Sequence, residues 1–289
     1  MAVVVSHPTG SAFVRAVLRA FSSQGVLDSF WTSLAVPSVL IEGRGPGARA
    51  RRELGRRAFP EVQWSRIHLR PTREIARICA TRLGLRRLVE HETGWASVDQ
   101  VYRHLDRKVA RYLSRQTPGV KAVYAYEDGA RDTFITAREM DVRTIYDLPI
   151  AHWRTLRRLL QEEATLHPAW APTMEGLRDS EAKLERKDEE IRLADHIVVA
   201  SSFTRRSIED HFGEGLPITV APYGAPPPLI AHPIGRKAGA PIQLLYAGHL
   251  AQRKGLVYLI AALRTLDIPW RLTLAGPRPV FAPSELVSF

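Results

Sequence analysis

The sequence has little of what marks several classes of protein. Its 289 residues include one cysteine, Cys79, so neither an intrachain disulfide nor a cysteine-based metal cluster is available. There is no apolar run of about eighteen residues, the length needed to span a bilayer. The opening apolar run, Ala2–Val5, has no preceding basic residue and no cleavage-like site after it, so we expect no signal peptide. G-x-S-x-G, P-loop and G-x-G-x-x-G motifs are also absent. The lack of a signal peptide and of a membrane-spanning run predicts a cytoplasmic protein.

Acidic residues are scarce in one part of the chain. Between Arg44 and Arg115 there are 18 Lys and Arg against 7 Asp and Glu, which accounts for the whole net charge of +11. Such a surface favours an anionic partner, namely acidic lipid, a phosphorylated substrate or nucleic acid. An arginine-rich composition with solvated helix faces explains it equally well. No nucleic-acid motif accompanies the charge, and Phe59, Trp64 and Trp95 are not interleaved with it, so we expect no nucleic-acid partner.

Apolar strands alternate with helical patterns along the chain. Strands are predicted at 3–6, 30–34, 120–124, 143–146, 197–200 and 218–220, and helices at 13–21, 99–114, 134–140, 152–166, 180–194 and 201–212. The window 44–87 is interpreted as mostly basic helix, in which Cys79 is a small core residue. This alternation predicts an α/β doubly wound fold with a parallel sheet.

Proline and glycine divide the chain. Residues 226–240 carry Pro226, Pro227, Pro228, Pro233 and Gly239, a composition typical of a linker. We therefore predict a Rossmann-like N-terminal domain over 1–225 and the start of a second α/β domain over 241–289.

The second domain begins with a strand–helix–strand pattern. Leu244–Gly276 has a short apolar strand ending at Gly248, then a basic pair, then a helical pattern and a second strand. Arg253 and Lys254 lie close to the predicted helix start, where they could hold a diphosphate. Solvated Arg–Lys pairs are also common at helix starts, so spacing alone leaves both interpretations open.

Four polar or glycine-containing turns follow predicted strands, and ligands of such folds bind at the carboxyl ends of the strands. Three of these turns belong to the first domain, and their candidates are His7, Gly10, Glu127 and Asp147. His7 could orient a hydroxyl or contact phosphate, Gly10 could admit a ligand to the backbone, and the carboxylates could accept sugar hydroxyls. Each also has an ordinary role in a turn. The spacing of the histidines shows no metal-ligand pattern, and we expect no metal and no cofactor.

Three segments together resemble the family 4, or group 1, glycosyltransferases of the GT-B fold. Ala194–Ser207, ADHIVVASSFTRRS, resembles the strand and helix that close the family's first domain. Ile218–Ala225, ITVAPYGA, is similar to its crossing into the second domain, and Leu244–Gly276 to its donor-binding unit. The resemblance implies two Rossmann-like domains, acceptor binding mainly in the first, and nucleotide-sugar binding mainly in the second.

The implied reaction is sugar transfer from a nucleotide diphosphate sugar to an acceptor hydroxyl, with retained configuration. Lys254 matches the family's lysine that contacts the donor diphosphate. Many members have an arginine directly after the strand-end glycine, where this chain has His249; Arg253 is the candidate substitute. Gly248 and His249 complete the implied donor-diphosphate site. The implied acceptor is a glycan, a lipid-linked molecule or a small molecule.

The chain departs from the family in two places. Tyr146 stands where many members have a histidine before the aspartate, so the family's histidine is absent there. The family's downstream motif with glutamates facing the donor does not occur before Phe289. We therefore expect a truncated donor domain and leave open whether the chain is active. The alternative is a non-catalytic protein that binds the acceptor or an anionic membrane surface, peripheral to the inner face of the membrane.

Overall fold

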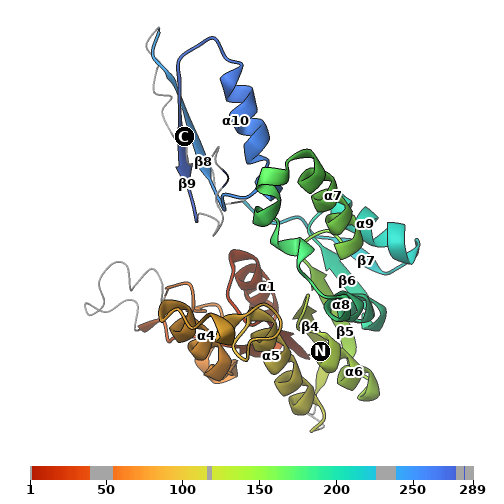
Figure 1. Cartoon of the computed structure of the whole chain (residues 1–289). Helices are drawn as coiled ribbons and strands as arrows, with labels where there is room; N and C mark the ends of the chain where they lie inside the picture. Colours follow the sequence, from red (N-terminus) through yellow and green to blue (C-terminus); the bar gives the residue numbers. More distant parts are fainter. Residues whose placement is uncertain (1, 40–54, 116–118, 226–238, 278–282, 284–289) are drawn as a thin grey trace. The chain divides into compact units, whose positions relative to one another are not determined.

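The computed structural model describes residues 2–39, 55–115, 119–225, 239–277 and 283. The chain divides into two compact units (Figure 1). Unit 1 comprises 1–152 and 180–224, and unit 2 comprises 153–179 and 225–289. Residues 153–179 belong with the second unit, although α8, β6, α9 and β7, which follow them in the sequence, belong to the first. Most of the expected linker, 226–238, lies outside the described residues.

Unit 1 is built on a parallel sheet of seven strands in the order β3-β2-β1-β4-β5-β6-β7. The strands are β1 (Ala2–Ser6), β2 (Leu27–Thr32), β3 (Ile67–Leu69), β4 (Val120–Tyr126), β5 (Arg143–Leu148), β6 (His196–Val199) and β7 (Ile218–Val220). The helices are α1 (Ala12–Ser23), α4 (Thr72–Arg82), α5 (Val98–Leu113), α6 (Arg131–Glu139), α8 (Glu181–Leu193) and α9 (Ser202–Phe212). The expected α/β, Rossmann-like N-terminal fold is confirmed.

Both faces of this sheet are buried, because side chains of successive strand residues point to opposite faces. Val3 and Val5 of β1 pack with α1 in one apolar cluster, whereas Val4 packs with α5 and α6 in another. Helices therefore cover both faces, and the carboxyl ends of the strands are left as the edge where loops can form a site.

Two expectations for the basic window are wrong. The described part of 44–87 is not mostly helix, because Ile67 and its neighbours form edge strand β3, paired with Phe30 and the rest of β2. Helix α4 is confined to Thr72–Arg82. Cys79 is exposed, whereas the adjacent Ala80 is buried, because only one side of α4 contacts the core. Residues 44–54 lie outside the described residues.

Unit 2 contains the parallel pair β8 (Ile242–Ala247) and β9 (Trp270–Ala275), joined through η5 (Gln252–Lys254) and α10 (Leu256–Arg264). It also contains α7 (Trp153–Leu166) and the short helices η3 (Pro168–Thr173) and η4 (Glu175–Leu177). Trp170 and Met174 pack with Leu250, Leu256 and Ile260 in its core. The expected strand–helix–strand pattern is present. Among the described helices of both units, none has the length and apolar content needed to cross a bilayer.

Candidate functional site

Unit 1 has a cavity of about 170 Å³ at the carboxyl ends of β1, β4 and β5, here called the strand-end pocket. Its lining combines aromatic rings, carboxylates and one lysine: His7, Val98, Asp99, Tyr102, Tyr126, Glu127, Asp128, Pro149 and Lys183. Two of the residues predicted from the sequence, His7 and Glu127, are therefore brought together here.

His7 directly follows β1 and is held by its own loop. Its Nδ1 lies 3.0 Å from the backbone nitrogen of Thr9, and its ring meets the Tyr126 ring edge-on at 4.4 Å. Burial lowers the pKa of His7 to about 4, although a backbone contact with Thr9 partly opposes this. The imidazole is therefore neutral near pH 7. It can donate a hydrogen bond to a hydroxyl, or accept one from it, without adding charge to the pocket.

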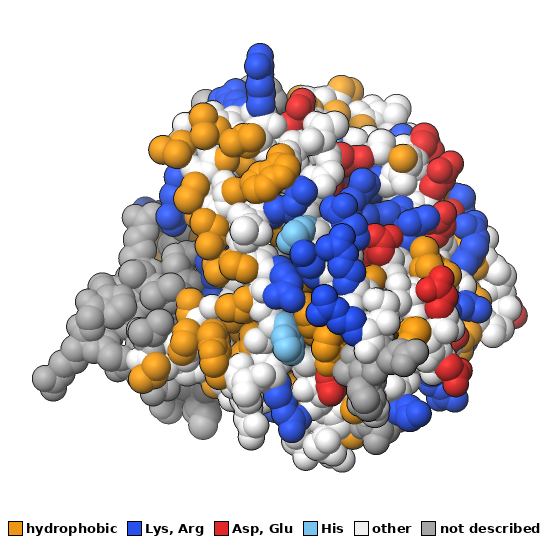
Figure 2. All heavy atoms as spheres, turned by 90° about the horizontal axis from the view of Figure 1, so that it is seen from below, with side chains coloured by type: hydrophobic (Ala, Val, Ile, Leu, Met, Phe, Trp, Pro, Cys, Tyr) orange, Lys and Arg blue, Asp and Glu red, His pale blue; other side chains and the backbone are white. Residues whose placement is uncertain are grey.

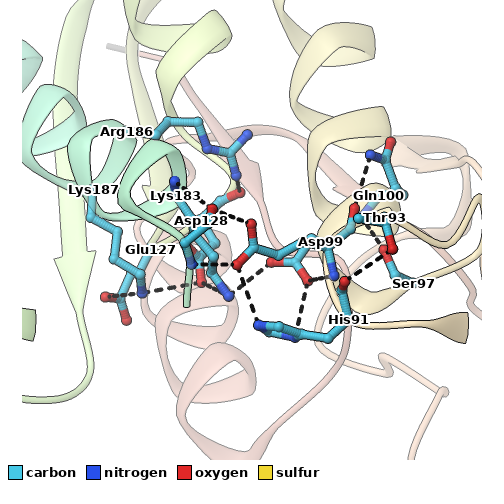
Figure 3. Close-up of polar contacts among 12 residues, drawn as sticks. His91, Thr93, Ser97, Asp99, Gln100, Glu127, Asp128, Lys183, Arg186 and Lys187 are labelled. Atoms are coloured by element: carbon cyan, nitrogen blue, oxygen red, sulfur yellow. Dashed lines mark hydrogen bonds and ion pairs between the residues drawn. The ribbon is translucent and has the colours of Figure 1, made fainter. Parts of the chain in front are cut away.

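Lysines from α8 neutralise the carboxylates around the pocket (Figure 3). Lys183 Nζ lies 2.8 Å from Asp99 Oδ1 and 3.9 Å from Asp128 Oδ2. Lys187 Nζ lies 2.6 Å from Glu127 Oε1 and 3.3 Å from Asp128 Oδ2. The two lysines are four residues apart, so they lie on one face of the helix, and both are buried. The network therefore ties α5, the end of β4 and α8 together.

The pKa values of these carboxyls respond differently to burial. Burial raises the pKa of Asp99, but the hydrogen bond and charge of Lys183 outweigh it and lower the pKa overall. Burial also raises the pKa of Glu127, and there the charge of Lys187 does not fully offset the effect. A carboxylate at Asp99 is thus better stabilised than one at Glu127.

Asp128 is the most constrained residue of the pocket. Its φ is 69°, in the left-handed region, and its Oδ1 is buried without a hydrogen-bond partner among the described residues. Glu190 of α8 holds this turn by accepting the backbone N–H groups of Asp128 at 2.9 Å and Ala130 at 3.0 Å, and the hydroxyl of Tyr146 at 2.9 Å. A strained backbone and an unsatisfied acceptor in one cavity are typical of a ligand site.

The other two predicted residues of unit 1 do not line the strand-end pocket. Asp147 is buried at the end of β5, where its Oδ2 accepts the hydroxyl of Tyr124 at 2.6 Å and its backbone oxygen accepts Glu127 N–H. Burial raises the pKa of Asp147. Gly10 packs against residues 56–59, since a Cβ there would lie 2.7 Å from the Phe59 ring. Both residues support the loops that form the pocket.

Sequence reasoning missed Asp99, Tyr102, Asp128 and Lys183, which come mostly from helices. The available signal was the segment of α8, which carries charged residues on every face; the structure buries Lys183, Lys187, Asp188 and Glu190. Charged residues on every face of a helix predict partners in the fold, because a buried charge is costly unless paired. The pattern does not say which residues those partners are.

Unit 2 presents its candidates on one short turn, here called the cationic turn. Arg253 and Lys254 lie in η5, after the carboxyl end of β8, and both are exposed. Neither has an ion-pair partner in the described parts of the chain. His249 is exposed nearby, and its backbone oxygen accepts the hydroxyl of Tyr246 at 2.8 Å. Gly248, Arg253, Lys254 and His249 thus all lie on the loop between β8 and α10.

Gln252 holds this turn in place through its hydrogen bonds. Its side chain is buried, with Nε2 donating to Glu163 Oε2 at 2.7 Å and Oε1 accepting Val257 N–H at 3.2 Å. Its backbone N–H donates to Thr173 Oγ1 at 3.1 Å. Residues 153–179 therefore hold the turn that carries the two cations, although they lie far from it in the sequence.

Two glycines let the turn form. Gly255 has a φ of 71° between η5 and α10, a left-handed conformation that costs other residues energy. At the same edge, a Cβ on Gly276 would lie 1.7 Å from the backbone oxygen of Gly248, so the two strand ends approach each other too closely for a side chain. The chemistry open to this edge is the binding of an anionic group by exposed cations.

No protein-family model matches the sequence, and no curated protein matches it. Solved structures do match. Apo UGT2 of Phytolacca americana has a TM-score of 0.50 at 13% identity, covering 96% of this chain and 64% of its own. A UDP-glucosyltransferase of Polygonum tinctorium gives 0.41 at 16% identity, with 96% and 65% covered. The lipopolysaccharide outer core galactosyltransferase WaaB gives 0.44 at 11%, with 95% and 60% covered.

The chain thus spans less than two thirds of the length of these three structures. The likeness to apo UGT2 concerns the fold, because the identity is low. Together with the parallel sheet of unit 1 and the second α/β unit, it supports the GT-B fold that the sequence predicts.

Proposed function

We propose that the protein is a family 4-type glycosyltransferase, which transfers a sugar from a nucleotide diphosphate sugar to an acceptor hydroxyl with retained configuration. The observation that carries the proposal is the cationic turn, with exposed Arg253 and Lys254 on a loop fixed at a strand end. The GT-B fold and the three segments resembling family 4 support it. The proposed acceptor domain is 1–225 apart from 153–179, which pack in unit 2 with the proposed donor domain 241–289, and 226–240 joins the two domains.

In this proposal the cationic turn binds the donor diphosphate. Arg253 and Lys254 stabilise the negative charge that grows on the diphosphate as the sugar leaves. Gly248 lets the backbone approach the phosphates, and His249 contributes a hydrogen bond. Because Gln252 fixes the turn before the donor arrives, little ordering is needed on binding.

The strand-end pocket is the proposed acceptor side. The neutral imidazole of His7 and the carboxyl of Glu127 are placed to hydrogen-bond acceptor hydroxyls, and the unpartnered Oδ1 of Asp128 can accept a further one. Gly10 and Asp147 contribute through the loops they support. The cavity of about 170 Å³ has space for about one small ring, which suits a hydroxyl-bearing group of a glycan, a lipid-linked molecule or a small molecule.

Binding of nucleoside diphosphates tests the donor site separately from turnover. Isothermal titration of the full chain with UDP, GDP and ADP is expected to show binding of at least one, and Lys254→Ala is expected to weaken it about tenfold to a hundredfold. Arg271→Ala is the matched control, because Arg271 is an exposed cation at the opposite end of β9 and should leave binding unchanged.

Absence of binding to all three nucleotides, or equal losses in Lys254→Ala and Arg271→Ala, would overturn the donor assignment. For the nucleotide that binds, transfer from its sugar conjugates to hydroxyl acceptors is then measured. The anomeric configuration of the product, determined by nuclear magnetic resonance, tests retention.

A further inference from the structure

Unit 1 carries a cluster of cations that do not line the strand-end pocket. Burial lowers the pKa of His104, and the positive charges of Arg73, Lys108, Arg107 and Arg70 lower it further. Burial and the charge of Arg107 also lower the pKa of Arg73. These residues come from the end of β3, from α4 and from α5, so the fold gathers cations that the sequence spreads over about forty positions. Figure 2 shows Lys and Arg side chains gathered on one face, with hydrophobic side chains beside them.

The cluster is not neutralised by the nearest carboxyl of α4. Glu74 is buried and is bound by Arg77 through two hydrogen bonds of 2.8 Å. Arg107 instead donates from Nε to the backbone oxygen of Arg103 at 3.1 Å, one turn earlier on α5. Among the described residues, no ion pair joins Arg70, Arg107 or Lys108 to a carboxylate, and Arg107 is exposed.

Large apolar side chains are exposed in the segment between α4 and α5. They are Leu83 (72% exposed), Leu85 (48%), Leu88 (41%) and Trp95 (52%). Single exposed leucines are ordinary, but a group of this kind within the short segment 83–95 marks an interaction surface.

Direct contacts join the apolar group to the cations. The Arg73 guanidinium lies 5.0 Å from the centre of the Trp95 ring and donates to the Trp95 backbone oxygen. Ala96, the next residue, donates its N–H to the backbone oxygen of Leu88 at 2.8 Å. These contacts join Arg73 to the segment that carries Trp95 and Leu88. The cations Arg70, Arg73, Arg107 and Lys108 and the exposed side chains of Leu83, Leu85, Leu88 and Trp95 are here called the docking face.

We infer that the docking face binds an anionic lipid bilayer. Cations near such a surface are drawn to acidic headgroups, while exposed leucine and tryptophan side chains enter the interfacial layer. A nucleic acid would use the cations but would leave the leucines in water, so the combination favours a bilayer. The inference goes beyond the proposed sugar transfer and does not depend on it.

Vesicle co-sedimentation with the full chain tests this surface. We expect binding to phosphatidylcholine vesicles containing about one third phosphatidylglycerol at about 0.1 M salt, and little binding to pure phosphatidylcholine. Arg111 is a further exposed cation, one turn after Arg107 on α5. The triple variant Arg107→Gln, Lys108→Gln, Arg111→Gln is expected to lower the partition coefficient about a hundredfold. Leu83→Ser with Leu85→Ser is expected to lower it about tenfold.

The matched control removes three exposed cations from the opposite edge of the same sheet, with Arg192→Gln, Arg205→Gln and Arg206→Gln. It should retain wild-type binding. Equal losses in both triple variants, or no binding of the wild type to the anionic vesicles, would overturn the inference. A third outcome would overturn the inference in favour of nucleic acid. In it, only the cation variant loses vesicle binding, the leucine variant binds as the wild type does, and the wild type binds a single-stranded RNA at the same salt.

Discussion

The cations around the strand-end pocket and those on the cationic turn differ in burial and in charge pairing. Around the pocket, Lys183 and Lys187 are buried and lie 2.6–3.9 Å from the carboxylates they neutralise. On the turn, Arg253 and Lys254 are exposed and have no ion-pair partner among the described residues. Buried ion pairs fix the positions of the side chains, because removing one partner leaves the other charge buried without compensation. Exposed cations on a rigid loop keep their charge for a ligand.

Three predictions test this difference, and the largest effect is expected from Glu190→Gln. Burial raises the pKa of Glu190 to about 8, against an ordinary value of 4.5. The native state therefore binds more protons than the unfolded state between these values, so the free energy of unfolding falls as pH rises through that window. In the wild type this decrease in the free energy of unfolding amounts to up to about 5 kcal/mol, and Glu190→Gln is expected to abolish it.

Urea denaturation followed by circular dichroism, repeated from about pH 5 to about pH 8, measures this slope. Glu185→Gln is the control, since Glu185 is an exposed carboxyl on the same helix, and it should keep the wild-type slope. Parallel curves for the wild type and Glu190→Gln would contradict the role given to burial.

Removing one of the lysines that neutralise the pocket carboxylates is expected to have the next largest effect. Lys187→Met leaves Glu127 and Asp128 without their nearest cation and should lower the free energy of unfolding by about 3–5 kcal/mol. Urea denaturation near pH 7 measures it. Lys121→Met, which removes an exposed lysine from β4, should stay within about 0.5 kcal/mol of the wild type. Similar values for both variants would mean that the pocket charges are not coupled.

The smallest effect on stability is expected in the cationic turn. Gln252→Ala removes the side-chain hydrogen bonds to Glu163 and Val257, at a cost of about 2 kcal/mol in unit 2. It should also weaken nucleoside diphosphate binding about tenfold, because the cations lose their fixed position. Gln243→Ala, on the exposed side of β8, is the control for both measurements. Reduced stability with unchanged nucleotide affinity would show that the turn does not position the cations.

Much of the fold could be predicted from local patterns. The hydrophobic periodicity identified helices α1, α5 and α9 closely. Helix α9 begins after Ser201, whose side chain accepts Thr204 N–H at 3.1 Å. Strand β3 was missed, because Ile67–Leu69 is short and is defined by its pairing with β2. The exposure of Cys79 was also missed, since α4 is too polar for its buried side to be identified from spacing.

The candidate site was less predictable than the fold. His7 and Glu127 follow strands, and the rule that ligands bind at strand ends was enough to select them. Asp99 and Lys183 lie in helices separated by more than eighty residues, and only the packing of α5 against the end of β4 and α8 brings them to the same pocket. Likewise, nothing near Gln252 in the sequence indicates its bonds to Glu163 and Thr173.

The sequence by itself determined the order of strands and helices, the division into two α/β parts, and the position of the basic pair after a strand, since each depends on neighbouring residues. The tertiary structure alone decided which charges are neutralised. Lys183 and Lys187 were placed against carboxylates, Arg253 and Lys254 were left exposed, and the cations of the basic window were gathered beside exposed leucines. Charge pairing depends on distances between distant segments, and those distances are set only when the core packs.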